Sequence, residues 1–172
     1  IGKAEKRYNI SGIGDILSIY IADWEWKIAK ENRRSMSGFQ FKDDPYDSAV
    51  ARVSLSLLKA LEDNIEEIRE TTPKGLRALA ELLIYSGYVT NMYGSGRPES
   101  GAEHLFASAV VNTYHDRHFL HGELVSLGTL LAAYFQERDV GYVADIIRKA
   151  GLLLSLNTIG LTAEEAIHAL SI

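Results

Sequence analysis

The stretch IGDILSIYIADWEWKIA, residues 13–29, carries the pattern that decides the fold. Its apolar residues recur mainly at steps of three and four, which is the period of an amphipathic helix with one buried face. The same period returns in four further stretches, over residues 45–70, 73–92, 124–135 and 140–150. We therefore predict an all-α, bundle-like helical fold for the chain.

Turn and capping residues predict where the helices begin. Asp44-Pro45 suits the N-cap and first position of the second helix, after a polar loop over residues 31–44. Ser100 with Glu103, and Thr162 with Glu165, match the capping box, so short helices should start there and run to about residues 111 and 170. A histidine-rich loop is expected over residues 112–119. Residues 1–10 and 152–156 are candidate strands, but they have too few partners for a sheet.

Composition excludes several classes of function. The 172 residues are 47% apolar and 24% charged, which is the usage of an ordinary globular domain. A formal net charge of −5 argues against a nucleic-acid binder, which would carry a basic face. The absence of cysteine excludes disulfides, thiolate metal sites and a cysteine nucleophile. No stretch resembles a secretory signal or a membrane span of about 18 apolar residues, so we expect a cytoplasmic protein.

The histidines are the candidate metal ligands. His104 and His121 can share an ion only if the chain turns between them, because one continuous helix would hold them about 25 Å apart. Asp15 follows two glycines at the start of an apolar helix and could supply the carboxylate of a two-histidine, one-carboxylate site. From spacing alone, Asp15 could equally serve the helix dipole, and His104 could be a hydrogen-bonded core residue. His115 and His118 are expected to be solvated loop residues.

A glycine-rich turn, residues 94–101 (GSGRPESG), leads into a helix N-terminus. Its free backbone N–H groups and Arg97 could bind an anion such as phosphate, although an ordinary connector fits the same residues. The turn is neither a dinucleotide fingerprint nor a P-loop, because no strand precedes it and no Gly-Lys-Ser/Thr follows.

Four short strings resemble, in order and approximate spacing, the C-terminal helical half of the glycerol dehydrogenase and glycerol-1-phosphate dehydrogenase group. They are Gly12-Ile13-Gly14-Asp15, then Asp23-Trp24-Glu25, then residues 94–104 (GSGRPESGAEH), and His121-Gly122-Glu123 followed by Gly128-Thr129. That group is related in fold to iron-containing alcohol dehydrogenases and dehydroquinate synthase. The resemblance spans nearly the whole chain and is closer to the glycerol-1-phosphate enzymes.

The resemblance implies a metal-dependent, NAD(P)-linked alcohol dehydrogenase whose metal ligands map onto Asp15, His104 and His121. Zinc is the favoured ion, with nickel or iron chemically admissible. Arg97 and Ser100 would then lie near the phosphate of the substrate. One departure is Ser108, which stands where these relatives usually carry a further histidine.

The resemblance also implies that residues 1–172 form one helical metal-binding domain of a longer enzyme. In that family an N-terminal α/β domain holds the nicotinamide cofactor, and no strand–turn–helix fingerprint occurs in this chain. The isolated chain should therefore bind metal without turnover. The expected partners are a polyol or polyol phosphate, the N-terminal domain and further copies in a homo-oligomer, without nucleic acid or a membrane span.

Three alternatives stay open. One is a simple glycerol dehydrogenase. Another is a lyase of the dehydroquinate synthase type, which Asp15 disfavours because the first ligand there is usually Glu. The last is a non-catalytic helical module, which Ser108 favours.

Overall fold

The structure is a computed structural model that describes residues 4–31, 44–152 and 154–171. Every regular element within these residues is a helix. The helices are α1 (Lys6–Ser11), α2 (Ile13–Leu17), α3 (Ile19–Glu31), α4 (Ser48–Asp63), α5 (Ile65–Arg69), α6 (Pro73–Tyr93), α7 (Ala102–Thr113), α8 (His121–Phe135), α9 (Val140–Lys149), α10 (Leu156–Ile159) and α11 (Ala163–Leu170). The predicted all-α fold is therefore confirmed. None of these helices combines the length and hydropathy that crossing a membrane requires.

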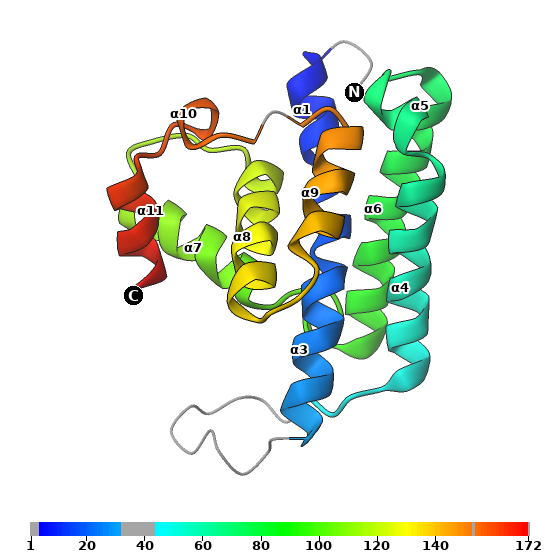
Figure 1. Ribbon diagram of the computed structural model, residues 1–172. Helices are drawn as coiled ribbons and strands as arrows, with labels where there is room; N and C mark the ends of the chain where they lie inside the picture. Colours follow the sequence, from blue (N-terminus) through cyan, green and yellow to red (C-terminus); the bar gives the residue numbers. More distant parts are fainter. Residues whose placement is uncertain (1–3, 32–43, 153, 172) are drawn as a thin grey trace.

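The helices form two packed groups around two hydrophobic clusters (Figure 1). The larger cluster takes buried residues from α1 to α6, from α9 and from the C-terminal part of α8. The smaller cluster joins α7, the N-terminal part of α8, α10 and α11, with Phe106, Val110 and Leu124 buried in it. Helix α8 contributes to both clusters, so its N-terminal end lies where the two groups meet.

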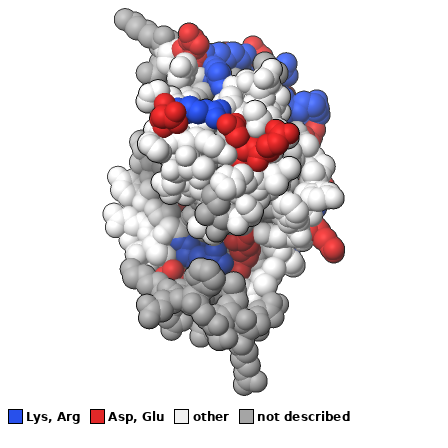
Figure 2. Space-filling model, turned by 90° about the vertical axis from the view of Figure 1, so that its left-hand side faces the viewer, with Lys and Arg blue, Asp and Glu red and all other residues white. Residues whose placement is uncertain are grey.

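The side formed by α7, α10 and α11 is shown in Figure 2. Acidic and basic side chains are mixed at the top of this face, and more lie in its lower part beside the residues drawn in grey. A broad band between them carries neither kind. This face therefore lacks the extended basic surface that nucleic-acid binding would require.

Several predicted helix boundaries agree with the structure. Helix α6 begins at Pro73, with the Thr72 hydroxyl accepting from the N–H of Gly75, and ends at Gly94 in the left-handed conformation (φ 86°). Pro and Gly suit these two positions because Pro needs no N–H at a helix start and Gly adopts positive φ without strain. The capping box of α11 is present, with Thr162 and Glu165 bonded reciprocally.

Two predicted long helices are each divided. The helix predicted over residues 13–29 breaks at Ser18 into α2 and α3, and the Ser18 hydroxyl lies 2.7 Å from the carbonyl oxygen of Asp15. The helix predicted over residues 45–70 breaks at Asn64, whose side chain donates to the carbonyl of Ala60. In both cases a short polar side chain competes with the backbone N–H groups for a carbonyl oxygen. The spacing of apolar residues does not reveal this competition.

Other predicted boundaries were wrong. The helix predicted to start at residue 45 is α4, which starts at Ser48. The carboxylate of Asp47, rather than that of Asp44, accepts from the N–H groups of Ala49 and Val50. Helix α7 starts after Gly101, not at Ser100, and Glu103 bonds the N–H of Gly101. Helix α8 begins at residue 121 rather than 124, and α7 extends into the loop predicted over residues 112–119.

The candidate strands were also wrong in the described part of the chain. Residues 6–10 of the first tract belong to the helix α1. In the second tract, the described residues 152 and 154–156 contain no strand, and residue 156 begins α10. The predicted loop over residues 31–44 lies almost wholly outside the described residues.

Candidate metal centre

Asp15 lies in the first turn of α2, between residues that belong to the hydrophobic core. Its carboxylate is 29% exposed. Burial by itself favours the neutral acid, but the contacts with His104 and His121 outweigh burial and lower the pKa of Asp15 to about 2. The carboxylate is therefore ionised, as a metal ligand must be.

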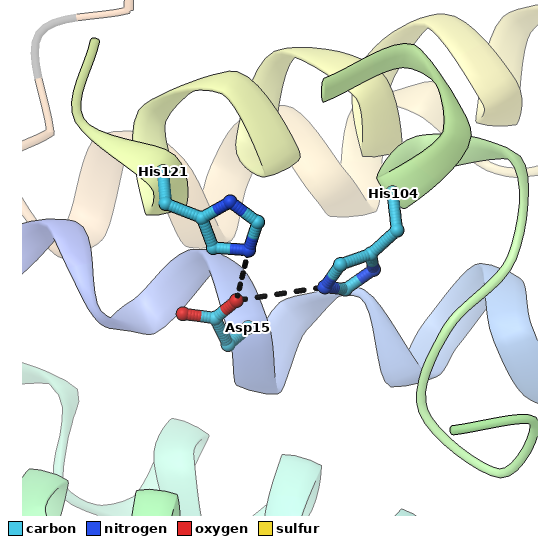
Figure 3. Close-up of side chains that lie close together, drawn as sticks. All are labelled: Asp15, His104 and His121. Atoms are coloured by element: carbon cyan, nitrogen blue, oxygen red, sulfur yellow. Dashed lines mark ion pairs between the residues drawn. The ribbon is translucent and has the colours of Figure 1, made fainter. Parts of the chain in front are cut away.

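His121 and His104 approach Asp15 from two other helices (Figure 3). His121 is the first residue of α8, and its Nε2 lies 3.2 Å from Oδ1 of Asp15. His104 lies in the first turn of α7, and its Nε2 lies 3.6 Å from the same oxygen. The turn between α7 and α8 thus brings together two histidines that are far apart in sequence.

These donor atoms fit a single ion. The three ligand atoms all lie within 4.8 Å of one another. Two ligands held about 2.1 Å from a tetrahedral zinc ion are about 3.4 Å apart, a separation bracketed by the observed 3.2 and 3.6 Å. Two imidazole nitrogens and one carboxylate oxygen form a donor set that also leaves a coordination position open, as a catalytic site requires.

Glu103 orients His104. Its carboxylate is fully buried, and Oε1 lies 2.9 Å from Nδ1 of His104 and accepts from the N–H of Gly101 at 2.6 Å. Burial alone would lower the pKa of His104, but hydrogen bonds to Asp15 and Glu103 outweigh it and raise the pKa to about 9. Because Nδ1 donates to Glu103, Nε2 is the nitrogen that faces Asp15. At neutral pH the metal-free His104 is protonated, so an ion that binds Nε2 must displace its proton.

A second buried carboxylate holds the start of α8 in place. Glu123 is 1% exposed and accepts two hydrogen bonds from Arg7, at 2.6 and 2.7 Å. The Arg7 guanidinium also donates to the carbonyl of Thr158. This arginine therefore ties α1 and α10 to the helix whose first residue is His121.

A cleft of about 640 Å³ adjoins the cluster. Two of the candidate ligands, Asp15 and His104, line it. The remaining lining residues are mostly small or polar: Leu83, Ser86, Gly87, Thr90, Asn91, Gly94, Ser95, Gly96, Glu99 and Ser100. No Lys or Arg occurs among these lining residues, and apart from His104 the polar groups that they offer are hydroxyl, amide and carboxyl groups.

After the glycine-rich turn, two backbone N–H groups that could bind an anion are already bonded to carboxylates. The N–H of Gly101 is bonded to Glu103, and the N–H of Ala102 to the carboxylate of Glu25 at 3.0 Å. The Arg97 guanidinium lies 3.7 Å from Glu25 and 3.4 Å from the carbonyl of Ser100. Ser100 lines the cleft, whereas Arg97 is not among its lining residues.

The other histidines lie outside the cluster. His115 and His118 are exposed in the turn after α7, as predicted, and His168 is exposed on α11. Ser108 is exposed on α7. Sequence reasoning gave no role to Arg7 or Glu123. Glu103 and Glu123 could have been found because each lies within two positions of a predicted histidine ligand. Nothing in the neighbouring sequence points to Arg7.

Comparison with known proteins supports the resemblance seen in the sequence. No protein-family model matches the chain. The chain is 33% identical over its full length to a protein of Aeropyrum pernix named glycerol-1-phosphate dehydrogenase, with NAD(P)+ in the name, and covers 46% of that protein. Proteins of the same name from Saccharolobus solfataricus and Sulfurisphaera tokodaii are 36% and 35% identical over 94% and 100% of the chain. The chain is homologous to glycerol-1-phosphate dehydrogenases.

The likeness covers only part of these enzymes. The chain spans about half the length of the curated relatives that it matches. Its all-helical structure fits a C-terminal part of the glycerol-1-phosphate dehydrogenase group, as the four sequence strings had indicated.

Proposed function

We propose that the chain is the metal-binding half of an NAD(P)-linked dehydrogenase that interconverts glycerol 1-phosphate, or a related polyol, and a dihydroxyacetone-type ketone. The observation that carries this proposal is the cluster of Asp15, His104 and His121 at a polar cleft. It occurs in a chain that is similar throughout to enzymes named for this reaction.

The proposed ligands are Asp15, His104 and His121, with zinc as the favoured ion and nickel or iron as chemically suitable alternatives. When bound, a divalent ion supplies Lewis-acid stabilisation of negative charge on a substrate oxygen. Glu103 contributes by holding the His104 ring in one orientation, because its buried carboxylate bonds Nδ1.

The cleft supports a polyol as the substrate class. Ser86, Thr90, Asn91 and Ser100 offer hydroxyl and amide groups that can exchange hydrogen bonds with a polyol. These groups would position the substrate carbon that loses or gains hydride beside the ligand cluster. Hydride transfer itself requires the nicotinamide of NAD(P), which we assign to an α/β domain in the other half of the full enzyme.

The phosphate of the substrate is assigned to Ser100 and Arg97. Ser100 belongs to the cleft wall, and Arg97 bonds its carbonyl oxygen. A phosphate could gain charge-assisted hydrogen bonds from Arg97 if the guanidinium turned from Glu25. Residues 1–172 would act as one domain of a cytoplasmic, homo-oligomeric enzyme and would be inactive alone.

One observation favours a second candidate, glycerol dehydrogenase. The lining residues of the cleft include no Lys or Arg, which suits a neutral polyol better than a phosphate. The two candidates differ in the charge of the substrate and share the ligand cluster.

Metal content tests the ligand assignment. The purified chain, loaded with zinc and then desalted, should retain close to one ion per chain by elemental analysis. Asp15→Ala and His121→Ala should weaken binding by more than about 100-fold, because even residues that only orient a ligand cost 10–100-fold when changed. His118→Ala, an exposed histidine outside the cluster, is the matched control. Unchanged binding in both ligand variants would refute the site.

Substrate preference tests the reaction. In the enzyme that carries both halves, kcat/KM should be higher for glycerol 1-phosphate than for glycerol. Arg97→Ala should lower only the value for the phosphate substrate, by about 10–100-fold if hydrogen bonds of 1.5–3 kcal/mol are lost. Equal losses for both substrates would mean that Arg97 serves the fold through Glu25. A wild-type preference for glycerol would favour glycerol dehydrogenase.

A further inference from the structure

The three helices that carry the candidate ligands touch through their backbones at glycines. A Cβ atom added to Gly14 of α2 would lie 2.1 Å from the carbonyl oxygen of Gly122 on α8. A Cβ atom added to Gly122 would lie 1.8 Å from the carbonyl oxygen of Ser11, which ends α1 two positions before α2 begins. Ordinary contacts of a Cβ begin at 3.4 Å. Helices α2 and α8 are therefore closer at this point than any residue other than glycine allows.

These glycines are the chain neighbours of two ligands. Gly14 precedes Asp15, and Gly122 follows His121. This contact between α2 and α8 is thus one residue away from the pair of side chains whose ligand atoms lie 3.2 Å apart. Moving the two backbones apart would separate these atoms directly, because each ligand is joined to the contact by a single peptide bond.

The third ligand has a corresponding contact. A Cβ added to Gly128 of α8 would lie 2.6 Å from the carbonyl oxygen and 2.8 Å from the Cα of Glu103 on α7. Glu103 precedes His104 and bonds its Nδ1. All three ligands are therefore adjacent in the chain to a residue that makes one of these backbone contacts.

The geometry points to Gly14, Gly122 and Gly128 as positioning residues that set the distances among the three metal ligands. The inference rests on the proposed metal site and concerns how the fold builds it. A Cβ at Gly14 or Gly122 would require the helices to part by about 1 Å or more to restore an ordinary contact. Metal–ligand bonds tolerate only about 0.2 Å, so a displaced ligand must strain or leave the ion.

The chain offers a matched control at Gly75. A Cβ there would lie 2.0 Å from the carbonyl oxygen of Glu67, in the contact between α5 and α6. These two helices carry none of the three ligands. Gly75→Ala should therefore disturb the packing as strongly as Gly14→Ala, while it leaves the ligand distances intact.

The test is a titration of the metal-free chain with Co²⁺, followed by visible absorption, together with thermal unfolding of each variant. Wild-type and Gly75→Ala should share one dissociation constant and one Co²⁺ spectrum, although Gly75→Ala unfolds at a lower temperature. Gly14→Ala and Gly122→Ala should raise the dissociation constant by about 10–100-fold and change the spectrum of the bound ion. Gly128→Ala, with the mildest clash, should stay folded and show the same effect through His104.

Each other outcome contradicts the inference in a distinct way. Wild-type affinity in the folded Gly14→Ala and Gly122→Ala variants would show that the backbone contacts do not set the ligand distances. If those two variants fail to fold, Gly128→Ala decides, and wild-type affinity there would overturn the inference. An equal loss of affinity in Gly75→Ala would show that the loss comes from lower stability of the fold and not from the ligand distances. A wild-type chain that takes up no Co²⁺ would refute the proposed metal site and the inference with it.

Discussion

Glu103 combines two roles, one at the start of α7 and one at His104. It is fully buried, bonds the N–H of Gly101 at the start of α7 and accepts from Nδ1 of His104. A buried carboxylate is costly unless hydrogen bonds compensate it. Both donors bond Oε1, whereas Oε2 of Glu103 is buried without a hydrogen-bond partner. The same carboxylate therefore begins the helix and orients the ligand that follows it.

Replacing this carboxylate should weaken metal binding more than it weakens the fold. We expect Glu103→Gln to raise the dissociation constant for Zn²⁺ by about 10–100-fold, because the amide holds the His104 ring less firmly than a charged acceptor does. Competition with a chromogenic chelator measures this change. Glu164→Gln is the control, because Glu164 is exposed in the first turn of α11, and this variant should bind zinc as the wild type does. Equal affinities in the two variants would remove Glu103 from the ligand environment.

Short helices at the two ends of the chain are attached by ion pairs as well as by buried apolar residues. Helix α1 is joined to α8 and α10 by Arg7, through Glu123 and the carbonyl of Thr158. Helix α11 is joined to the turn after α7 through Arg117 and Glu165, 2.7 Å apart. Helices of six and eight residues have little stability of their own, so they depend on such tertiary contacts.

Loss of the Arg7 side chain should destabilise the protein measurably. Arg7→Ala leaves Glu123 buried without its bidentate partner, which should lower the free energy of unfolding by about 1.5–3 kcal/mol. Because the Arg7 side chain is 45% exposed, solvent screening places the expected value near the lower end. Urea unfolding provides the measurement, with Lys6→Ala on the same helix as the control. A loss of unfolding free energy no larger than that of Lys6→Ala would show that water replaces Arg7 as the hydrogen-bond partner of Glu123.

The attachment of α11 should depend on pH. The N–H of Thr162, followed by Arg117, lowers the pKa of Glu165. A carboxyl group whose pKa is lower in the folded state stabilises the fold fully above its unfolded pKa, and this contribution disappears as the pH falls through the folded pKa. The difference in melting temperature between wild type and Glu165→Ala should therefore be largest above about pH 5 and shrink toward about pH 3. Glu164→Ala should show no such trend, and a constant difference for Glu165→Ala would contradict the assignment.

The molecule as a whole places the ligand cluster at the junction of its two hydrophobic clusters. Asp15 lies on α2, which belongs to the larger cluster, while His104 and His121 lie on helices of the smaller one. Metal binding would therefore join the two groups of helices, and a bound ion should raise the melting temperature of the entire chain.

Binding of the nicotinamide cofactor should be absent from this chain. A dinucleotide site needs a strand, a glycine-rich turn and a helix, and the described residues contain helices only. Titration of the 172-residue chain with NADH and NADPH, followed by fluorescence, should show no saturable binding. The longer protein with an α/β half should bind one of the two. Tight binding by the chain alone would reveal a nucleotide site of another kind.

Much of this structure follows from the sequence alone. Periodicity specifies the helices because a 3.6-residue repeat of apolar side chains is a local property, and the ends of α6 and α11 follow from Thr, Pro, Gly and Glu at capping positions. The helix breaks at Ser18 and Asn64 could not be predicted, because a single hydrogen bond from a side chain to a carbonyl leaves the apolar period unchanged.

The candidate ligands were proposed from residue type and spacing and then from sequence resemblance, but that they meet at one point is a property of the tertiary structure. Asp15, His104 and His121 come from three helices, and the packing of these helices, with close backbone contacts at Gly14, Gly122 and Gly128, brings their donor atoms within 4.8 Å of one another. The tertiary structure was likewise needed to find the partners of the buried Glu103 and Glu123. It also showed that Arg97 faces Glu25. Sequence determines the local period and the caps, whereas distances between helices depend on how closely two backbones can pack, which is decided by every contact along both helices at once.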